Sequence, residues 1–266
     1  MVSSMLSDMI NGLVIGVSML IPGVSGGTVA LICGIYYKLI VAVDTFFEKP
    51  RENIKFLASV AIGGVIGILA FSKLILFVYN TYKTPMVYLF MGSVLGSIPL
   101  LCKSAGIKRL NLKAIIYPML GLLVVLLLEC IPKDTFVINA DGLAEYLVIF
   151  LVGIVLATAL VLPGISFSYM LLILGLYEQT LRAVETVNIA YLFSMGLGVL
   201  VGVFLTAKVI RIILRKYPKQ TYLVIIGFVI ASLKDVFPGL PSGNELLISA
   251  LLLFGSFYAI FKVSNK

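Results

Sequence analysis

The sequence predicts an all-α polytopic membrane protein with an inverted-topology repeat, in which each half contains one re-entrant, broken-helix hairpin and three transmembrane helices. Three observations predict this fold: the composition, a Pro-Gly-x-Ser motif that occurs twice, and the distribution of Lys and Arg. Of the 266 residues, 61% are hydrophobic and 12% are charged, whereas soluble domains are about 45–50% apolar and about 25% charged. The chain therefore has the composition of an integral membrane protein without a sizeable soluble domain.

Six segments approach the length of about 20 mostly apolar residues that a membrane-spanning helix needs. They fall into two groups of three, which are 54–80, 85–101 and 112–131, then 189–214, 221–237 and 245–262. Each group follows one of the two Pro-Gly-x-Ser motifs. We therefore expect three spans after each motif.

The first motif, "IPGVSGGT" at 21–28, interrupts an apolar stretch. A helix over 9–21 would be only about 20 Å long, short of the hydrocarbon core of about 30 Å. Pro22 disfavours helix in the residue before it and lacks an amide donor. A second apolar helix is expected over 25–43. Two short helices joined by a non-helical tip predict a re-entrant hairpin.

The second motif, "LPGIS" at 162–166, lies 141 residues after the first. Its flanking helices are expected over 145–162 and 166–183. These helices are longer than the first pair. A hairpin that crosses the membrane fully therefore stays open as an alternative here.

The repeat extends beyond the hairpins, because residues 56–82 align without gaps on 191–217 at an offset of 135. We assign 1–137 to the first repeat and 138–266 to the second. A hairpin crosses the membrane zero or two times and three spans follow it, so each half makes an odd number of crossings. The two halves are then inverted relative to each other, as in many transporters. The matched identities include Gly63 with Gly198, Gly67 with Gly202, Lys73 with Lys208, and Tyr82 with Tyr217.

The distribution of Lys and Arg indicates the orientation. With this topology, fourteen of the 20 Lys and Arg lie on the side of the N-terminus, four lie on the other side, and Lys73 and Lys208 lie within spans. Cytoplasmic loops are enriched in Lys and Arg, so both termini are expected in the cytoplasm. The net charge of +8 then reflects orientation, and no nucleic-acid partner is expected.

The tips of the two hairpins are candidates for an anion site. The second helix of each hairpin begins at the tip, so its first amides point there with partial positive charge. Hydroxyl side chains can cap the helix or donate to an oxyanion, and glycines let a ligand approach the backbone. In inverted halves the two tips would meet near the midplane. The alternative is that Pro-Gly only kinks a helix and the glycines only pack. The hydroxyl residues are Ser25, Thr28, Ser166 and Ser168, and the glycines are Gly23, Gly26 and Gly27.

Charged residues inside the apolar segments are further candidates. Lysine within a span is costly and is functional by default, which applies to Lys73 and Lys208; the alternative is that both snorkel to an interface. Glu178 is a candidate proton carrier or a partner for Arg182 one turn later. An interfacial ion pair without a role in transport is the alternative for these two residues.

The sequence gives no support for a metal, a cofactor or covalent catalysis. It contains no His, and its three Cys have no metal-ligand spacing, so no metal or cofactor is expected. A Walker motif, which would indicate ATP-driven transport, is also absent from the sequence.

The motifs "IPGVSGGT…GIY" and "LPGIS…LGLYE" resemble those of the PopT-type polyprenyl-phosphate translocases, and the resemblance covers essentially the whole chain. It implies transport of undecaprenyl phosphate from the outer to the cytoplasmic leaflet of the bacterial cytoplasmic membrane, which recycles the lipid carrier of cell-wall polymers. Phe167 departs from the pattern, because a small residue like Gly26 is expected there. The motif positions of the family correspond to Pro22, Gly23, Ser25, Gly26, Gly27, Thr28, Pro163, Gly164, Ser166 and Ser168.

Two other functions stay open at this point. One is transport of a small soluble anion, which would need a sealed aqueous route. The other is a membrane enzyme acting on the same lipid phosphate, against which the lack of His counts. The oligomeric state, the energy source and the exact lipid are not determined by the sequence.

Overall fold

The computed structural model describes residues 2–21, 24–107, 112–131, 143–165 and 167–264. Within these ranges the chain forms twelve α-helices and no β-strand, which confirms the predicted all-α class. The first six helices are α1 (Val2–Ser18), α2 (Gly26–Ile32), α3 (Tyr36–Asp44), α4 (Pro50–Thr81), α5 (Lys83–Ser104) and α6 (Leu112–Glu129). The last six are α7 (Leu143–Val161), α8 (Phe167–Ile173), α9 (Tyr177–Glu185), α10 (Ile189–Lys216), α11 (Pro218–Val236) and α12 (Asn244–Ser264).

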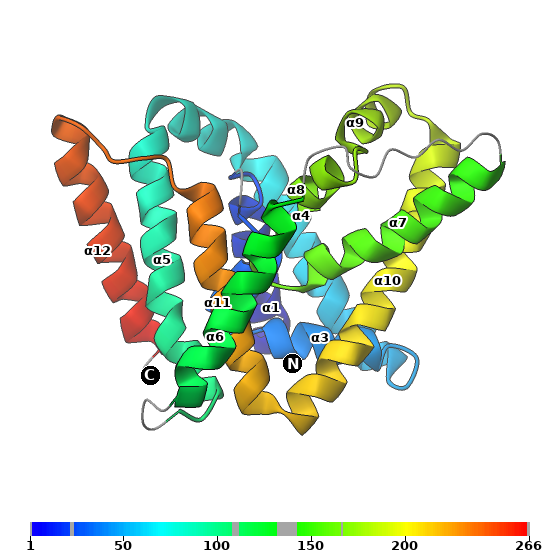
Figure 1. Cartoon of the computed structure of the whole chain (residues 1–266), viewed down its shortest axis with the longest axis horizontal. Coiled ribbons are helices and arrows are strands. Elements are labelled where there is room, and N and C mark those ends of the chain that lie inside the picture. The colour runs from blue at the N-terminus through cyan, green and yellow to red at the C-terminus, as the bar shows by residue number, and fades with distance from the viewer. Residues whose placement is uncertain (1, 22–23, 108–111, 132–142, 166, 265–266) are drawn as a thin grey trace.

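The same order of helices occurs twice. In each half a long first arm is followed by a helix of 7 residues and a helix of 9 residues, and then by three longer helices. Figure 1 shows α3 at the same end of the molecule as the N-terminus and α9 at the opposite end. This one pair of corresponding helices therefore lies at opposite ends of the molecule.

The prediction of a single helix over 25–43 is wrong, because the chain turns sharply after α2. Gly34 has a φ of +71°, its N–H donates to Leu31 O, and the N–H of Ile35 donates to Ala30 O. These two bonds form a Schellman motif, which ends a helix at a left-handed glycine. The axes of α2 and α3 consequently differ by 117°.

The predicted helix over 166–183 is interrupted in the same way. Gly175 has a φ of +69°, its N–H donates to Leu172 O, and the N–H of Leu176 donates to Leu171 O. Gly34 and Gly175 are 141 residues apart, the offset of the two motifs. The second arm of each hairpin is thus a pair of short helices.

The first arm of each hairpin packs closely on the first long helix of its own half. A methyl group on Gly63 of α4 would lie 2.0 Å from Met9 O of α1. At the corresponding position of the second half, a methyl group on Gly198 of α10 would lie 2.0 Å from Phe150 O of α7. Glycine at these positions lets the two backbones touch, as in many membrane helix pairs.

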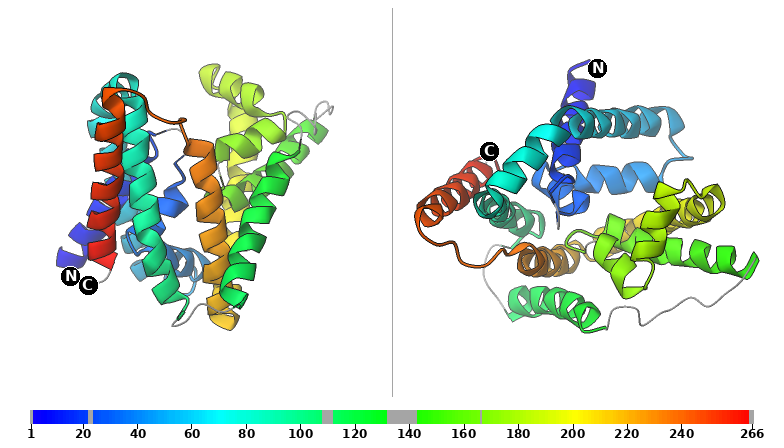
Figure 2. Two further views of the ribbon diagram at one scale, coloured as in Figure 1. Left: turned by 60° about the vertical axis from the view of Figure 1, so that its left-hand side comes forward. Right: turned by 90° about the horizontal axis from the view of Figure 1, so that it is seen from above.

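The third long helix of each half packs on the opposite half. α12 packs on α5, and α6 packs on α11; Figure 2 shows both pairs side by side from two directions. Both contacts again depend on glycine, because a methyl group on Gly92 would lie 2.1 Å from Leu253 O and one on Gly227 would lie 2.0 Å from Pro118 O. The two halves are therefore interlocked.

Five helices of the described part are long and apolar enough to cross a membrane, namely α4, α5, α7 over 144–161, α10 and α12 over 245–262. α2 and α3 together would make a sixth, bent crossing. The segments predicted as spans over 112–131 and 221–237 form α6 and α11, which pack on each other but are not among the five. Because α7 is among them, the first arm of the second hairpin is long enough to cross the membrane.

Candidate functional site

The two hairpin tips are in contact, as predicted. The backbone N–H of Gly164 donates to Thr28 Oγ1 over 3.1 Å, and Thr28 is only 2% exposed. A methyl group on Gly27 would lie 3.4 Å from Pro163 Cα. The start of α2 thus meets the second Pro-Gly pair, which is more than 130 residues away in the sequence.

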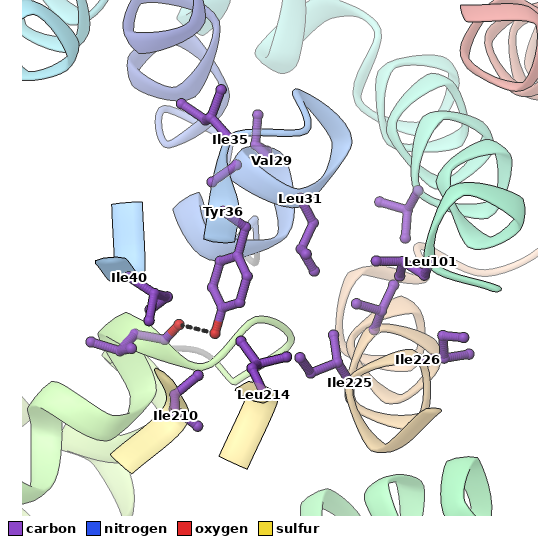
Figure 3. Close-up of a cluster of buried hydrophobic side chains, with 14 of the residues drawn as sticks. Val29, Leu31, Ile35, Tyr36, Ile40, Leu101, Ile210, Leu214, Ile225 and Ile226 are labelled. Atoms are coloured by element: carbon purple, nitrogen blue, oxygen red, sulfur yellow. Dashed lines mark hydrogen bonds between the residues drawn. The ribbon is translucent and has the colours of Figure 1, made fainter. Parts of the chain in front are cut away.

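A second hydrogen bond joins the same two regions. The buried hydroxyl of Tyr36 donates to the carbonyl oxygen of Val161 over 3.2 Å, which Figure 3 shows as a dashed line within a cluster of buried side chains. Val161 is the last residue of α7, so its carbonyl has no partner within the helix. The contact satisfies a polar group that would otherwise be unpaired beside the break.

The tip of the second hairpin has no space for a side chain at Gly164. Its φ is +82°, and a methyl group would lie 2.2 Å from Phe228 O of α11. Pro163 beside it is fully buried. The second Pro-Gly pair is thus fixed between the first tip and α11.

Ser25 is the N-cap residue of α2, with φ of −86° and ψ of 129°. Its side chain makes no capping hydrogen bond, and it is partly exposed. Its carbonyl oxygen accepts from the N–H of Val29 over 3.2 Å. The hydroxyl of Ser25 is therefore available to a ligand at the first tip, whereas the Thr28 oxygen is already engaged with the second tip.

Four of the sequence-predicted residues lie outside what the structure describes. These are Pro22, Gly23 and Ser166, together with the side chain of Ser168. Their roles stay predictions.

The structure does not bring the two matched lysines together. Lys73 is exposed on α4, eight residues before the end of that helix. Lys208, eight residues before the end of α10, lines a pocket of about 490 Å³ that also includes Asp44 and Arg211. The two lysines therefore belong to separate surfaces.

Glu178 and Arg182 form an exposed pair on α9. Their charged atoms lie 3.8 Å apart, and their side chains are 85% and 79% exposed. Exposed pairs of this kind contribute about 0–1 kcal/mol. The geometry matches the ion-pair interpretation, and a role of Glu178 in proton transfer stays a prediction.

Two ion pairs at the two ends of α3 were not predicted from the sequence. Lys38 Nζ lies 2.9 Å from Asp8 Oδ1 of α1 and 3.9 Å from the centre of the Phe56 ring of α4. At the other end of α3, Asp44 pairs with Arg211 of α10. Asp8, an isolated acidic residue in an apolar segment, could have indicated the first of these pairs.

The second hairpin has a weaker counterpart of the Asp8–Lys38 contact. Gln179 of α9 donates to Glu145 Oε1 of α7 over 3.0 Å, and Gln179 lies 141 residues after Lys38. In both hairpins, then, a side chain of the second short helix contacts a residue in the first two turns of the first arm.

Apolar helices of spanning length, with two broken-helix hairpins in contact at their tips, define the class as a multi-pass helical membrane protein. The family model described as VCA0040-like, undecaprenyl phosphate translocase-like, matches residues 15–248. The chain belongs to this family, and the resemblance inferred from the two motifs is confirmed.

Two curated relatives are similar over most of their length. The polyprenyl-phosphate transporter of Staphylococcus aureus (strain NCTC 8325 / PS 47) is 30% identical over 261 residues, which cover 93% of this chain and 91% of that protein. The polyprenyl-phosphate transporter of Vibrio cholerae serotype O1 is 26% identical over 257 residues, which cover 88% of this chain and 78% of that protein. No solved structure shows a significant match to the chain.

Proposed function

We propose that this protein is a flippase that moves undecaprenyl phosphate from the outer to the cytoplasmic leaflet of the bacterial cytoplasmic membrane, without covalent chemistry. Relatives named polyprenyl-phosphate transporters support the substrate class. The observation that carries the mechanism is the contact between Thr28 and Gly164. Non-helical backbone inside a membrane is tolerated only where protein buries it or where it lines a cavity, so two such breaks at one place indicate a functional centre.

We infer that the halves have inverted topology and that the first hairpin is re-entrant. The Asp8–Lys38 pair supports re-entry, because it places the start of α3 beside the N-terminal part of α1. The chain thus comes back to the side from which α1 starts. The opposite positions of α3 and α9 support inversion (Figure 1). Labelling with an impermeant thiol reagent tests this in a variant that lacks the native cysteines: Ser242→Cys should react in intact cells and Ser104→Cys should not. Equal labelling of both variants would contradict the inversion.

We place the phosphate at the first tip. The Ser25 hydroxyl and the amides of Gly26 and Gly27 are the donors in this proposal, since the first four amides of a helix have no intrahelical partner. α2 has only 7 residues, so these individual donors, rather than a long helix dipole, would hold the anion. Ser166 and Ser168 are the proposed counterparts at the second tip.

The remaining motif residues have structural roles in this proposal. Pro22, Gly23 and Pro163 interrupt the helices, and Thr28 and Gly164 keep the two tips together. Lys73 and Lys208 would attract the lipid phosphate from opposite sides, because each lies at the same place in one of two matched helices.

A leaflet-resolved assay in liposomes tests the proposed function. Purified protein should accelerate the movement of undecaprenyl phosphate, more than that of undecaprenyl diphosphate, and should not move inorganic phosphate. Transport of inorganic phosphate alone would favour a soluble-anion transporter, and release of phosphate from the lipid would indicate an enzyme. Thr28→Val, which keeps the side-chain shape but removes the acceptor for Gly164 N–H, should lower the rate.

A further inference from the structure

Two apolar grooves lie on the molecule at corresponding positions of the two halves. The α4–α5 groove has a volume of about 860 Å³ and extends from Ile21, beside the first tip, to Tyr82, where α4 passes into α5. The α10–α11 groove has a volume of about 570 Å³ and extends from Leu162, beside the second tip, to Tyr217, where α10 passes into α11. Both volumes lie in the range of about 300–1,000 Å³ that is typical of ligand sites.

The grooves are related by the internal repeat. Ten of the eleven residues that line the α10–α11 groove have their counterpart in the α4–α5 groove, at an offset of 141 for Leu162 and 135 for the others. In Figure 1 the junction of α4 with α5 and the junction of α10 with α11 lie at opposite ends of the molecule, so the two grooves end on opposite sides.

Each groove ends at a tyrosine with a lysine beside it. Lys83 follows Tyr82, and its Nζ lies 5.8 Å from the ring centre of Tyr79. Lys216 precedes Tyr217, and its Nζ lies 5.3 Å from that ring. Tyrosine and lysine at helix ends are typical of the membrane interface. Each groove is therefore lined by apolar side chains and ends at a tyrosine whose neighbour in the sequence is a lysine, although neither lysine lines the groove itself.

We propose that the two grooves are leaflet-specific docking sites for polyprenyl monophosphate, one for each leaflet. The polyprenyl chain lies along the groove towards the nearer tip, and the phosphate lies at Lys83 in one groove and at Lys216 in the other. A lipid with a single long apolar chain and an anionic head is complementary to this pattern. The inference rests on the proposed function, which it extends from the lipid phosphate to the polyprenyl chain of the lipid.

The two grooves then mark the first and last positions of the lipid during transport. In either groove the head is at the interface and the chain already points to the contact between Thr28 and Gly164. The headgroup has to travel between Lys83 and Lys216 past this contact, while the polyprenyl chain moves from one groove into the other.

Photocrosslinking tests the docking sites directly. Undecaprenyl phosphate with a photoreactive group at the end of its chain is bound to the protein in nanodiscs, and the adducts are mapped by mass spectrometry. The adducts should fall on residues of both grooves, and excess undecaprenyl phosphate should suppress them whereas phosphatidate should not. Adducts spread over the exposed face of α4 around Leu69, or suppressed equally by phosphatidate, would overturn the proposal.

Variants test the same sites by affinity. Val78→Trp and Ile213→Trp should each fill one groove and weaken binding of undecaprenyl phosphate about tenfold, which corresponds to about 1.4 kcal/mol. Leu69→Trp is the matched control, because Leu69 is 74% exposed on α4 and lines neither groove. Lys83→Gln and Lys216→Gln leave the lining of the grooves unchanged and should weaken binding by a similar factor, with Lys103→Gln as their control.

The outcomes separate this inference from the proposed function. Wild-type binding and flux in the tryptophan and lysine variants would overturn the docking sites and leave the flippase intact. An unmutated protein that neither binds nor moves undecaprenyl phosphate would overturn the flippase itself. If a tryptophan variant does not fold, the lysine variants and the crosslinks decide.

Discussion

The two hairpins have matching motifs and matching breaks, but they end in different contacts. α3 packs on α10 of the opposite half, where Asp44 pairs with Arg211 and the rings of Phe47 and Phe204 stack with their centres 5.7 Å apart. α9 packs on α10 and α8 of its own half, and it makes no comparable contact with α4 among the described residues. One end of the molecule is therefore bridged between the halves and the other is not.

The sequence explains this difference. Asp44 corresponds to Glu185 in the second hairpin, but the position that corresponds to Arg211 is Leu76. An ion pair cannot form there, and Leu76 is 51% exposed. The two hairpins are thus alike in their motifs and in their breaks, whereas the contacts at their ends differ. With the predicted orientation, the bridged end faces the cytoplasm.

The largest expected effect concerns the two tips. Gly164→Ala should destabilise the protein by about 4 kcal/mol or more, because alanine is strained at positive φ and its methyl group would overlap a backbone oxygen of α11. Gly27→Ala at the first tip should be tolerated, because its methyl group would meet Pro163 only at 3.4 Å. Thermal unfolding in detergent measures both. Equal losses for the two variants would contradict the difference between the tips.

Next in size is the loss of the Ser25 hydroxyl. A hydrogen bond to a charged group contributes about 1.5–3 kcal/mol, so Ser25→Ala should weaken binding of undecaprenyl phosphate by about ten- to a hundredfold. The fold should not change, since this side chain makes no capping bond. Binding is measured with the purified variant, and Ser104→Ala is the control, because Ser104 is exposed at the end of α5 and lines neither groove. An unchanged affinity would remove Ser25 from the phosphate site.

A smaller effect is expected at the bridge between α3 and α10. The side chains of Asp44 and Arg211 are 13% and 27% exposed, so their coupling should exceed that of a surface pair. A double-mutant cycle with Asp44→Asn and Arg211→Gln should give about 1–2 kcal/mol.

The smallest effect is expected on α9. The exposed Glu178–Arg182 pair should couple by no more than about 0.5 kcal/mol, and Glu178→Gln should leave stability unchanged. Transport measurements on the same variant test for a role of Glu178 that does not involve stability. A flux that loses its dependence on a proton gradient in Glu178→Gln would restore this residue as a proton carrier.

Much of the fold was predictable because the signals are local. Apolar length predicts α4, α5, α10 and α12, and the Pro-Gly motifs predict the two tips. The break after α2 was missed because the apolar run continues through Gly34, and glycine alone is tolerated within membrane helices. The recurrence of Gly-x-Tyr at Gly34 and Gly175 was the available signal, since a left-handed glycine followed by an apolar residue ends helices.

The candidate site was predictable only in part. The motifs indicated that the tips would meet, but which donor meets which acceptor depends on the break at Gly34, which brings Tyr36 to Val161. The Asp44–Arg211 pair joins residues 167 positions apart, and its formation depends on the direction of α3 after that break. An internal repeat also does not say which half a helix packs on, so the pairing of α6 with α11 was not visible in the sequence.

The interlocked pairing of α5 with α12 has a consequence for biosynthesis. α12 begins 140 residues after α5 ends, and at about 5–20 residues per second the ribosome needs on the order of 10 s to make that stretch. During this interval the glycine face of α5, around Gly92, has no helix to cover it. The nascent chain is then open to wrong partners in the membrane, and a chaperone or insertase that shields α5 until α12 emerges would raise the yield of folded protein.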